Sequence, residues 1–286
     1  MITARRFLFF GLVMTTTLAG TAMMLGIVGA AGITVLEIVI LGLFIPTFGW
    51  IVLTFWSAVT GFVLTLLHRA AITLERVRAP ASPLPPIVTR TALVMPAHNE
   101  DPHRLVGGLE AIITSLEATG QAGPFDIHLL SDTTDPDVAV VEESVWADMR
   151  RRSLRPGRLH YRRRPDNVDH KAGNVADFCR TWGARYDFMV VLDADSLMSG
   201  ETVVAMVREM QATPRAGLIQ SVPLPARQET LFGRFIQFAA TLYSPMLATG
   251  HAFWQAETGN YWGHNAILRV KPFIEHARLP VLPGKP

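Results

Sequence analysis

The chain has 286 residues, a formal net charge of +2 and 49% apolar residues, which allows one or two domains. Its single cysteine, Cys179, excludes an internal disulfide and is typical of a reducing compartment. The charges are unevenly placed, because Glu37 is the only charged residue between Phe7 and Leu67. This distribution predicts three parts: a transmembrane hairpin in residues 1–68, a linker in 69–90 and a soluble domain in 91–286.

Two apolar stretches open the chain. Residues 7–30 are long enough for one helical span and residues 38–67 for a second, with Pro46 tolerated as a kink. A signal peptide is the main alternative for the first stretch, but a second apolar stretch directly after it argues against this. The tendency of positive charge to stay inside predicts a two-helix hairpin with both flanks in the cytoplasm. The arginines that flank the two stretches are Arg5, Arg6, Arg69, Arg76 and Arg78.

Strands and helices alternate in the soluble part. This alternation predicts an α/β domain with a mostly parallel sheet and helices on both faces. The four prolines in residues 79–90 indicate a semi-extended linker before it. Segments typical of strands cover 91–95, 125–130, 188–192 and 217–222, and 158–164 is a strand or an extended segment. Helices are predicted over 105–118, 138–152, 171–183 and 201–212.

An apolar stretch at 231–253 is interrupted by Arg234, Gln237, Pro245 and His251. Three roles are open for it: a core helix, an interfacial helix lying on the membrane, or a third span. The polar residues make a span the least favoured role, and we expect an interfacial helix.

The buried run from Phe188 to Leu192 leads directly into Asp193 and Asp195. Burying unpaired carboxylates is costly, so we expect both just past the strand, at the edge where open α/β sheets bind ligands. Two carboxylates one residue apart suit a hard cation such as Mg²⁺, which completes its shell with water and substrate phosphates. The alternative is a solvated Asp-rich turn.

Polar residues also follow two other predicted strands. Asn99 and Glu100 follow the first and Asp132 follows the second. In a parallel sheet these ends meet at one edge, which suits a nucleotide diphosphate, with one carboxylate on the base or ribose and others on a metal. No glycine-rich phosphate loop occurs, so a cation and basic side chains would have to bind the phosphates. A capped turn is the alternative for Asn99 and Glu100, and an ordinary helix start is the alternative for Lys171 and Asn174.

Several motifs together resemble the processive inverting glycosyltransferases of family 2, which include cellulose and hyaluronan synthases. The resemblance covers the chain from Pro96 onward and is closest to the branch that makes osmoregulated periplasmic glucans. The motifs are Pro96-Ala-His-Asn-Glu, Leu130-Ser-Asp-Thr-Thr-Asp-Pro-Asp, Lys171-Ala-Gly-Asn, Asp193-Ala-Asp, Gln220-Ser-Val-Pro-Leu-Pro and Gly259-Asn-Tyr-Trp-Gly-His-Asn.

The resemblance implies a nucleotide-diphospho-sugar transferase (GT-A-like) fold in a multi-pass protein of the bacterial inner membrane, with the soluble domain cytoplasmic. It implies transfer of glucose from UDP-glucose to a growing β-1,2-linked glucan, with Mg²⁺ or Mn²⁺ as cofactor. Membrane lipid, the glucan acceptor and a periplasmic glucan-processing protein are the further partners expected. The arginines at 150–164 lack a supporting fold signal for nucleic acid; a solvated face or contact with anionic lipid is expected there.

The same resemblance implies roles for individual residues. Asp132 would contact the uracil or ribose, Asp193 would lie near the nucleotide and ligate metal, and Asp195 would ligate metal on the diphosphate. Lys171 would neutralise phosphate and Asn174 would orient its loop, while Asn99 and Glu100 are further candidates for nucleotide contact. Trp262 and His264 belong to the segment that would bind the acceptor, although aromatic core packing is the alternative for Trp262.

The general base of the family is expected beyond Pro286, so the chain resembles the front part of a longer enzyme. We expect it to bind the donor and to polymerise little. Two other functions stay open: a membrane protein that senses UDP-sugar without catalysis, and a metal-dependent phosphatase with Asp193 as nucleophile. In phosphatases of that kind the Asp pair typically follows the first strand and has Thr or Val where this chain has Leu197.

Overall fold

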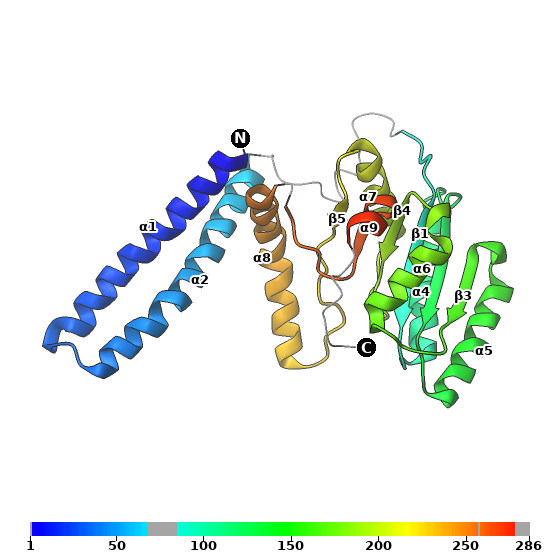
Figure 1. The fold of residues 1–286 in the computed structure, drawn as a ribbon, viewed down its shortest axis with the longest axis horizontal. Coiled ribbons are helices and arrows are strands. Elements are labelled where there is room, and N and C mark those ends of the chain that lie inside the picture. Colours follow the sequence, from blue (N-terminus) through cyan, green and yellow to red (C-terminus); the bar gives the residue numbers. More distant parts are fainter. Residues whose placement is uncertain (1, 68–84, 257, 278–286) are drawn as a thin grey trace. The chain divides into compact units, whose positions relative to one another are not determined.

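The computed structural model describes residues 2–67, 85–256 and 258–277. Most of the predicted linker lies outside these residues, as do Arg69, Arg76, Arg78 and the tail 278–286. The chain divides into two compact units (Figure 1), and each is described by itself. One contains Met1–Ile72 and Val222–Gly259, and the other contains Thr73–Ser221 and Asn260–Pro286.

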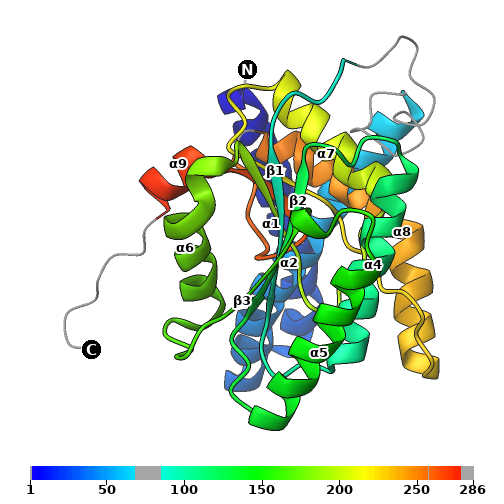
Figure 2. The ribbon, with the colours of Figure 1, turned by 90° about the vertical axis from the view of Figure 1, so that its right-hand side faces the viewer.

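The second unit is built on a six-stranded sheet in the order β3-β2-β1-β4-β6-β5. Figure 2 shows helices on both sides of this sheet. The four strands from β3 to β4 are parallel, and β6 runs antiparallel to both β4 and β5. The prediction of a mostly parallel sheet is therefore confirmed. The strands are β1 (Thr91–Ala97), β2 (Phe125–Ser131), β3 (Leu159–Arg163), β4 (Phe188–Val191), β5 (Leu218–Gln220) and β6 (Ala266–Arg269).

Helices cover both faces of this sheet because side chains alternate along each strand. In β1, Leu93 and Met95 join one apolar core, whereas Ala92 and Val94 join another. The first core is completed by α4 (Pro102–Ala118), α5 (Pro136–Arg152) and α7 (Gly200–Ala212). The second is completed by α6 (His170–Trp182) and α9 (Val270–His276).

Local capping explains where three of these helices begin. The side chains of Asp101, Asp135 and Ser199 each accept a backbone hydrogen bond from the first turn of α4, α5 and α7. Proline follows the first two caps, at a position where its missing N–H costs nothing. The first turns of α4 and α5 therefore lie at the carboxyl ends of the strands that precede them.

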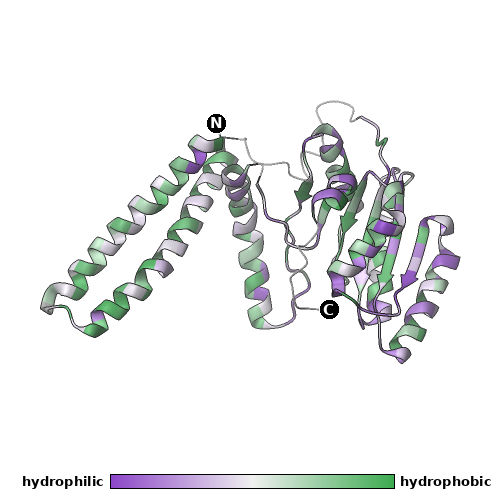
Figure 3. Ribbon diagram, viewed as in Figure 1, coloured by the Kyte–Doolittle hydropathy of each residue, from purple (hydrophilic) through white to green (hydrophobic). Residues whose placement is uncertain are grey.

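In its described residues, the first unit contains three α-helices, which are α1 (Ile2–Val28), α2 (Val35–Leu66) and α8 (Leu231–Gln255). By length and composition α1 and α2 qualify as membrane spans, and Figure 3 shows how apolar both are. The turn between them is the short helix Gly29–Ala31, and the indole of Trp56 donates a hydrogen bond to Thr16 Oγ1 at 3.1 Å. These contacts join α1 and α2 as a hairpin.

The stretch 231–253 forms one continuous helix, α8, which packs against α2 within the same unit. The contact is very close at Gly61 and Gly250. A Cβ atom added at Gly61 would overlap the carbonyl oxygen of Met246, and one added at Gly250 would overlap that of Ser57. Only glycine fits at both positions. At the same end of the unit, the Phe9 and Trp254 rings lie 4.9 Å apart.

Candidate functional site

One edge of the sheet gathers the chemically active side chains of the second unit. The register places Ala97 beside Ser131 and Ser131 beside Arg163, so β1, β2 and β3 end at a common level. The start of β6 reaches the same edge, because Ala266 lies opposite Val191 in antiparallel pairing. The structure thus brings together residues that follow β1, β2, β3 and β4 and residues that precede β6.

Asp193 lies at the centre of this edge, immediately beyond the end of β4. Its Oδ1 atom forms an ion pair with Lys171 Nζ, and its Oδ2 atom is 3.6 Å from His264 Nδ1. About a third of the Asp193 side chain is exposed. Burial and the negative charge of Asp193 raise the pKa of Tyr261 to about 12. Asp193 therefore connects the start of α6 with the segment that precedes β6.

In the Lys171-Ala-Gly-Asn motif, close contacts of Gly173 and Asn174 with neighbouring segments fix the position of Lys171. Gly173 passes so close to Val168 that a Cβ atom would overlap the Val168 carbonyl oxygen. Asn174 is buried; its Nδ2 donates to Leu130 O at 2.9 Å and its Oδ1 accepts from Arg162 Nη2 at 2.6 Å. Asn174 therefore anchors α6 to the ends of β2 and β3, which fits the predicted orienting role better than direct contact with a substrate.

Asp195 is exposed and, within the residues described, forms no hydrogen bond or ion pair. It lines a hollow of about 150 Å³ together with Glu100, Asp101, Arg104, Leu105 and Ala194. The structure thus brings Asp195 and Glu100 together, across the gap between β4 and the start of α4. The Asp101 carboxylate is already used as the α4 cap.

Asp132 is buried, and both of its carboxylate oxygens accept hydrogen bonds from Arg164. Arg164 Nη2 also donates to His170 O at 3.1 Å, next to Lys171. The backbone oxygen of Asp132 lies 2.8 Å from His98 Nδ1. Arg164 was not among the predicted site residues, because it stands in a basic run; its position directly after β3 was the signal that could have identified it.

Asn99 uses its side chain to hold the loop after β2. Its Oδ1 accepts from Thr134 N and Asp135 N, each at 3.0 Å, and its backbone has a positive φ of 55°. The asparagine side chain tolerates this left-handed conformation better than most. Asn99 therefore connects the loop after β1 to the start of α5, and Glu100 lines the hollow beside Asp195. Contact of either residue with a nucleotide stays a prediction.

The predicted acceptor segment contains two exposed aromatic rings, Tyr261 and Trp262, which are 39% and 50% exposed. This exposure argues against core packing for Trp262. The backbone of the segment is held by Gln220, the last residue of β5, and by Ser221, which follows it. The sequence predicts a strand over 217–222 but no site role for Gln220 and Ser221, because their contacts with the segment before β6 arise only when β5 and β6 pair.

Asp193 and Asp195 can bind a hard cation only if other ligands complete its coordination shell. The described residues contain no group of three or more His, Cys, Asp or Glu side chains placed to hold a metal ion. Asp193 and Asp195 supply two carboxylates, and Mg²⁺ or Mn²⁺ bound there would take its other oxygens from water and a diphosphate. The donor set therefore fits a cation that arrives with its nucleotide.

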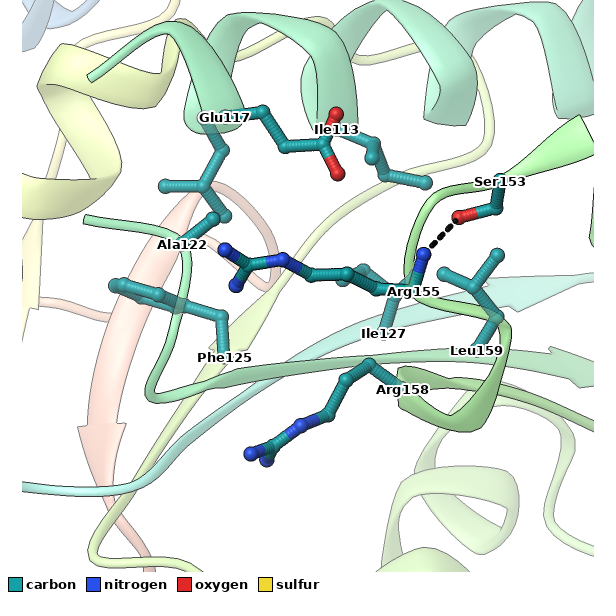
Figure 4. Close-up of a pocket in the computed structure, with 10 residues that line it drawn as sticks. Ile113, Glu117, Ala122, Phe125, Ile127, Ser153, Arg155, Arg158 and Leu159 are labelled. Carbon is teal, nitrogen blue, oxygen red and sulfur yellow. Dashed lines mark hydrogen bonds between the residues drawn. The ribbon is translucent and has the colours of Figure 1, made fainter. Parts of the chain in front are cut away.

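A second hollow lies away from this edge, between α4 and the starts of β2 and β3. Figure 4 shows Arg155 and Arg158 beside the apolar side chains of Ile113, Phe125 and Leu159. The arginines of the basic run do not form one free positive face, because most are paired with carboxylates. The pairs are Arg151 and Arg152 with Asp148, Arg158 with Asp126, Arg162 with Asp177, Arg163 with Glu143 and Arg164 with Asp132.

Curated relatives match nearly the whole chain. A protein of Xanthomonas campestris pv. campestris named "Glucans biosynthesis glucosyltransferase H" is 46% identical over 281 residues, covering 98% of this chain and 43% of the relative. Proteins with the same name from Dickeya dadantii and Bradyrhizobium diazoefficiens are 48% and 43% identical, over 88% and 100% of this chain and 29% and 37% of the relatives. The chain therefore spans less than half the length of these relatives.

Among solved structures, the mannosyltransferase PcManGT from Pyrobaculum calidifontis in complex with GDP-Man and Mn²⁺ is 16% identical, with a TM-score of 0.49. The match covers 79% of this chain and 58% of the mannosyltransferase chain. The model of the family described as "Glycosyl transferase family 2" matches residues 92–277, which include all six strands of the sheet except Thr91, the first residue of β1. The chain belongs to glycosyl transferase family 2.

Proposed function

We propose that this chain carries the donor-binding part of a membrane glucosyltransferase that uses UDP-glucose to build a β-linked glucan. The names of the relatives support glucan synthesis, and the β-1,2 linkage is part of the proposal through the sequence resemblance. The observation that carries the proposal is the meeting of Lys171, Asp193 and Asp195 at the edge where the parallel strands end. Family membership favours sugar transfer over the phosphatase alternative.

In this proposal different side chains bind the cation and the phosphates of a nucleotide diphosphate. Asp195, exposed beside Glu100, and Asp193 hold the cation that the diphosphate brings, and the cation neutralises charge on the leaving group. Lys171 supplies a fixed positive charge at the point where negative charge develops on the leaving UDP. Asp132 and Arg164 form a buried pair on the nucleotide side, and they orient the start of α6 through His170 O.

The exposed rings of Tyr261 and Trp262 are proposed to receive the acceptor, because the apolar face of a sugar ring packs well on an aromatic face. His264, in the same segment, has its Nδ1 atom 3.6 Å from the Asp193 carboxylate. The domain limits of 91–286 and 1–68 remain predictions, as does insertion of α1 and α2 into a bacterial inner membrane with the sheet domain in the cytoplasm.

Calorimetric titration of the detergent-solubilised protein with UDP-glucose and Mg²⁺ tests the donor site. We expect saturable binding, weakened at least about tenfold in Asp195→Ala, as is typical when an ionic contact to a bound ligand is lost. Asp148→Ala is the matched control, because its carboxylate is exposed on α5 and makes only surface ion pairs. Absence of UDP-glucose binding by the parent protein would refute the proposal, and so would unchanged binding by Asp195→Ala.

A non-catalytic sensor of UDP-sugar would show the same binding. The two functions are separated by adding an acceptor, such as the β-1,2-linked glucose disaccharide sophorose, and following UDP release. Acceptor-dependent release of UDP, by this chain or by a relative of full length, supports transfer. Binding with no release in either protein supports the sensor.

A further inference from the structure

The side-chain amide of Gln220 joins two segments that are far apart in the sequence. Its Nε2 atom donates to Ser221 O and His264 O, both at 2.9 Å, and to Asn265 O at 3.2 Å. Its Oε1 atom accepts from Trp262 N at 3.2 Å. One amide therefore satisfies polar backbone groups on both sides of Gly263, within the loop that precedes β6.

Asn265 continues this connection from the loop to the turn that follows β4. Its backbone oxygen accepts from Ser221 Oγ at 2.6 Å, and its Nδ2 donates to Ser196 Oγ at 3.1 Å. Ser196 N in turn donates to Asp193 O at 3.0 Å. Asn265 also has a positive φ of 51°, a conformation that persists only where neighbouring groups hold it.

Gln220 and Ser221 bond to backbone atoms of the loop, so the side chains of Tyr261 and Trp262 take no part in these bonds. The indole of Trp262 and the ring of Tyr261 stay exposed, while His264 Nδ1 lies 3.6 Å from Asp193. The loop is thus fixed to the Asp193–Ser196 turn, and the rings of Tyr261 and Trp262 are exposed and not packed in the core. A loop without these bonds would have to be ordered by its ligand, at a cost in binding free energy.

We propose that Gln220 is a positioning residue, which holds loop 261–265 against the turn of Asp193 so that Tyr261 and Trp262 form a preorganised surface for a sugar ring. The proposal rests on the proposed function in one respect, the identity of the ligand as a glucose-containing acceptor. The hydrogen-bond network that carries it does not depend on that identity.

Gln211 offers a matched control within the same unit. Its Oε1 atom accepts from Val88 N, Thr89 N and Thr89 Oγ1 at 3.1, 3.3 and 2.8 Å, and its Nε2 donates to Pro86 O at 3.3 Å. Like Gln220, it fixes a backbone segment through four contacts. It does so ahead of β1, at the opposite end of the strands from Asp193.

The test compares Gln220→Met with Gln211→Met, since methionine keeps the length of glutamine and removes the amide. Hydrogen exchange read by mass spectrometry should rise about tenfold in residues 261–265 for Gln220→Met, and only in residues 86–89 for Gln211→Met. Sophorose should quench tryptophan fluorescence in the parent protein and in Gln211→Met, with Trp262→Phe identifying the responding ring. In Gln220→Met the sophorose response should weaken about tenfold while the UDP-glucose affinity stays within about twofold.

Unchanged exchange in 261–265, or an equal loss of the sophorose response in Gln211→Met, would overturn the positioning role. If Gln220→Met does not fold, Ser221→Ala removes only the hydroxyl contact with Asn265 and should raise exchange in the same loop. Failure of the parent protein to bind UDP-glucose would refute the proposed function. The exchange comparison would then still decide whether Gln220 holds the loop.

Discussion

Arg164 donates to both carboxylate oxygens of Asp132, through Nε at 2.7 Å and Nη2 at 2.6 Å. The side chains are 11% and 3% exposed, so the pair is largely removed from water. Hydrogen bonding to Asp132 raises the pKa of Arg164 further above its ordinary value. A nucleotide that approaches this point meets a neutralised pair and not a free carboxylate.

Arg164→Met should destabilise the sheet domain by about 3–5 kcal/mol, because it leaves the Asp132 carboxylate buried without its partner. Arg163→Met is the control, since its guanidinium reaches Glu143 at 3.4 Å on the exposed surface and its loss should cost under about 1 kcal/mol. Urea unfolding followed by circular dichroism measures both. If Asp132→Asn added to Arg164→Met restores no stability, the cost does not come from the unpaired charge.

Lys171→Met should change divalent-cation binding and donor binding in opposite directions. Without the lysine, Asp193 loses its ion-pair partner and its carboxylate is free for a cation, so Mn²⁺ alone should bind more tightly. The UDP-glucose complex should bind more weakly, because a positive charge near the diphosphate is lost.

Electron paramagnetic resonance of free Mn²⁺ and calorimetry with UDP-glucose measure the two effects separately. Lys271→Met, on the exposed surface of α9, should change neither. A parallel fall in both affinities would show that Lys171 acts by holding the local fold and not through its charge.

His128 should make the stability of the sheet domain depend on pH. Its Nε2 atom lies 2.9 Å from the hydroxyl of Tyr186, and its ring stacks on His160 at 4.6 Å. Burial, and then the charge of His160, lower the pKa of His128 to about 3. The unfolded chain has a histidine pKa of about 6.5, so it binds the proton first as the pH falls.

The stabilisation from neutral His128 is therefore fully present above about pH 6.5 and is lost as the pH falls towards 3. Between pH 6.5 and 4.5 the free energy of unfolding should fall with a slope of up to about 1.4 kcal/mol per pH unit for this group. Urea unfolding across that range measures the slope, which should flatten in His128→Phe. His276→Phe, on the exposed surface, should keep the parent slope; a parent slope of zero would contradict the assignment.

Gly61→Ala should separate α8 from α2 or force both helices to shift, because the added methyl group has no space beside the Met246 carbonyl. Overpacking of this kind costs about 1–3 kcal/mol. Gly42→Ala, in the same helix but with open space around its Cα, should be neutral or slightly stabilising. Thermal unfolding in detergent compares the two, and equal midpoints would argue against a tight α2–α8 contact.

The alternation of β1 to β4 with α4 to α6 could be predicted because each element carries its own periodicity. The predicted strand 125–130 is one residue shorter than β2 at its end, and 158–164 is one residue longer than β3 at each end. The meeting of Asp132 and Asp193 at one edge also followed, since parallel strands bring their carboxyl ends together. These predictions needed only local pattern and one rule of topology.

The remaining features depend on pairing between distant residues. β6 was not predicted as a strand, and nothing in the four residues Ala266–Arg269 indicates that they run antiparallel to β4. The pairing of Asp132 with Arg164 likewise arises only when β2 and β3 lie side by side. For the same reason the role of Asn99 was open in the sequence, since its partners Thr134 and Asp135 belong to another loop.

The glycine contact between α2 and α8 has a consequence for the order in which the protein is made. The ribosome completes α1 and α2 first and then β1 to β5, and only afterwards does it produce α8. Until then the small surface around Ser57 and Gly61 has no helix against it. The contact between α2 and α8 can therefore form only after β1 to β5 have been synthesised, so the small-residue surface of α2 stays without its partner helix for that interval.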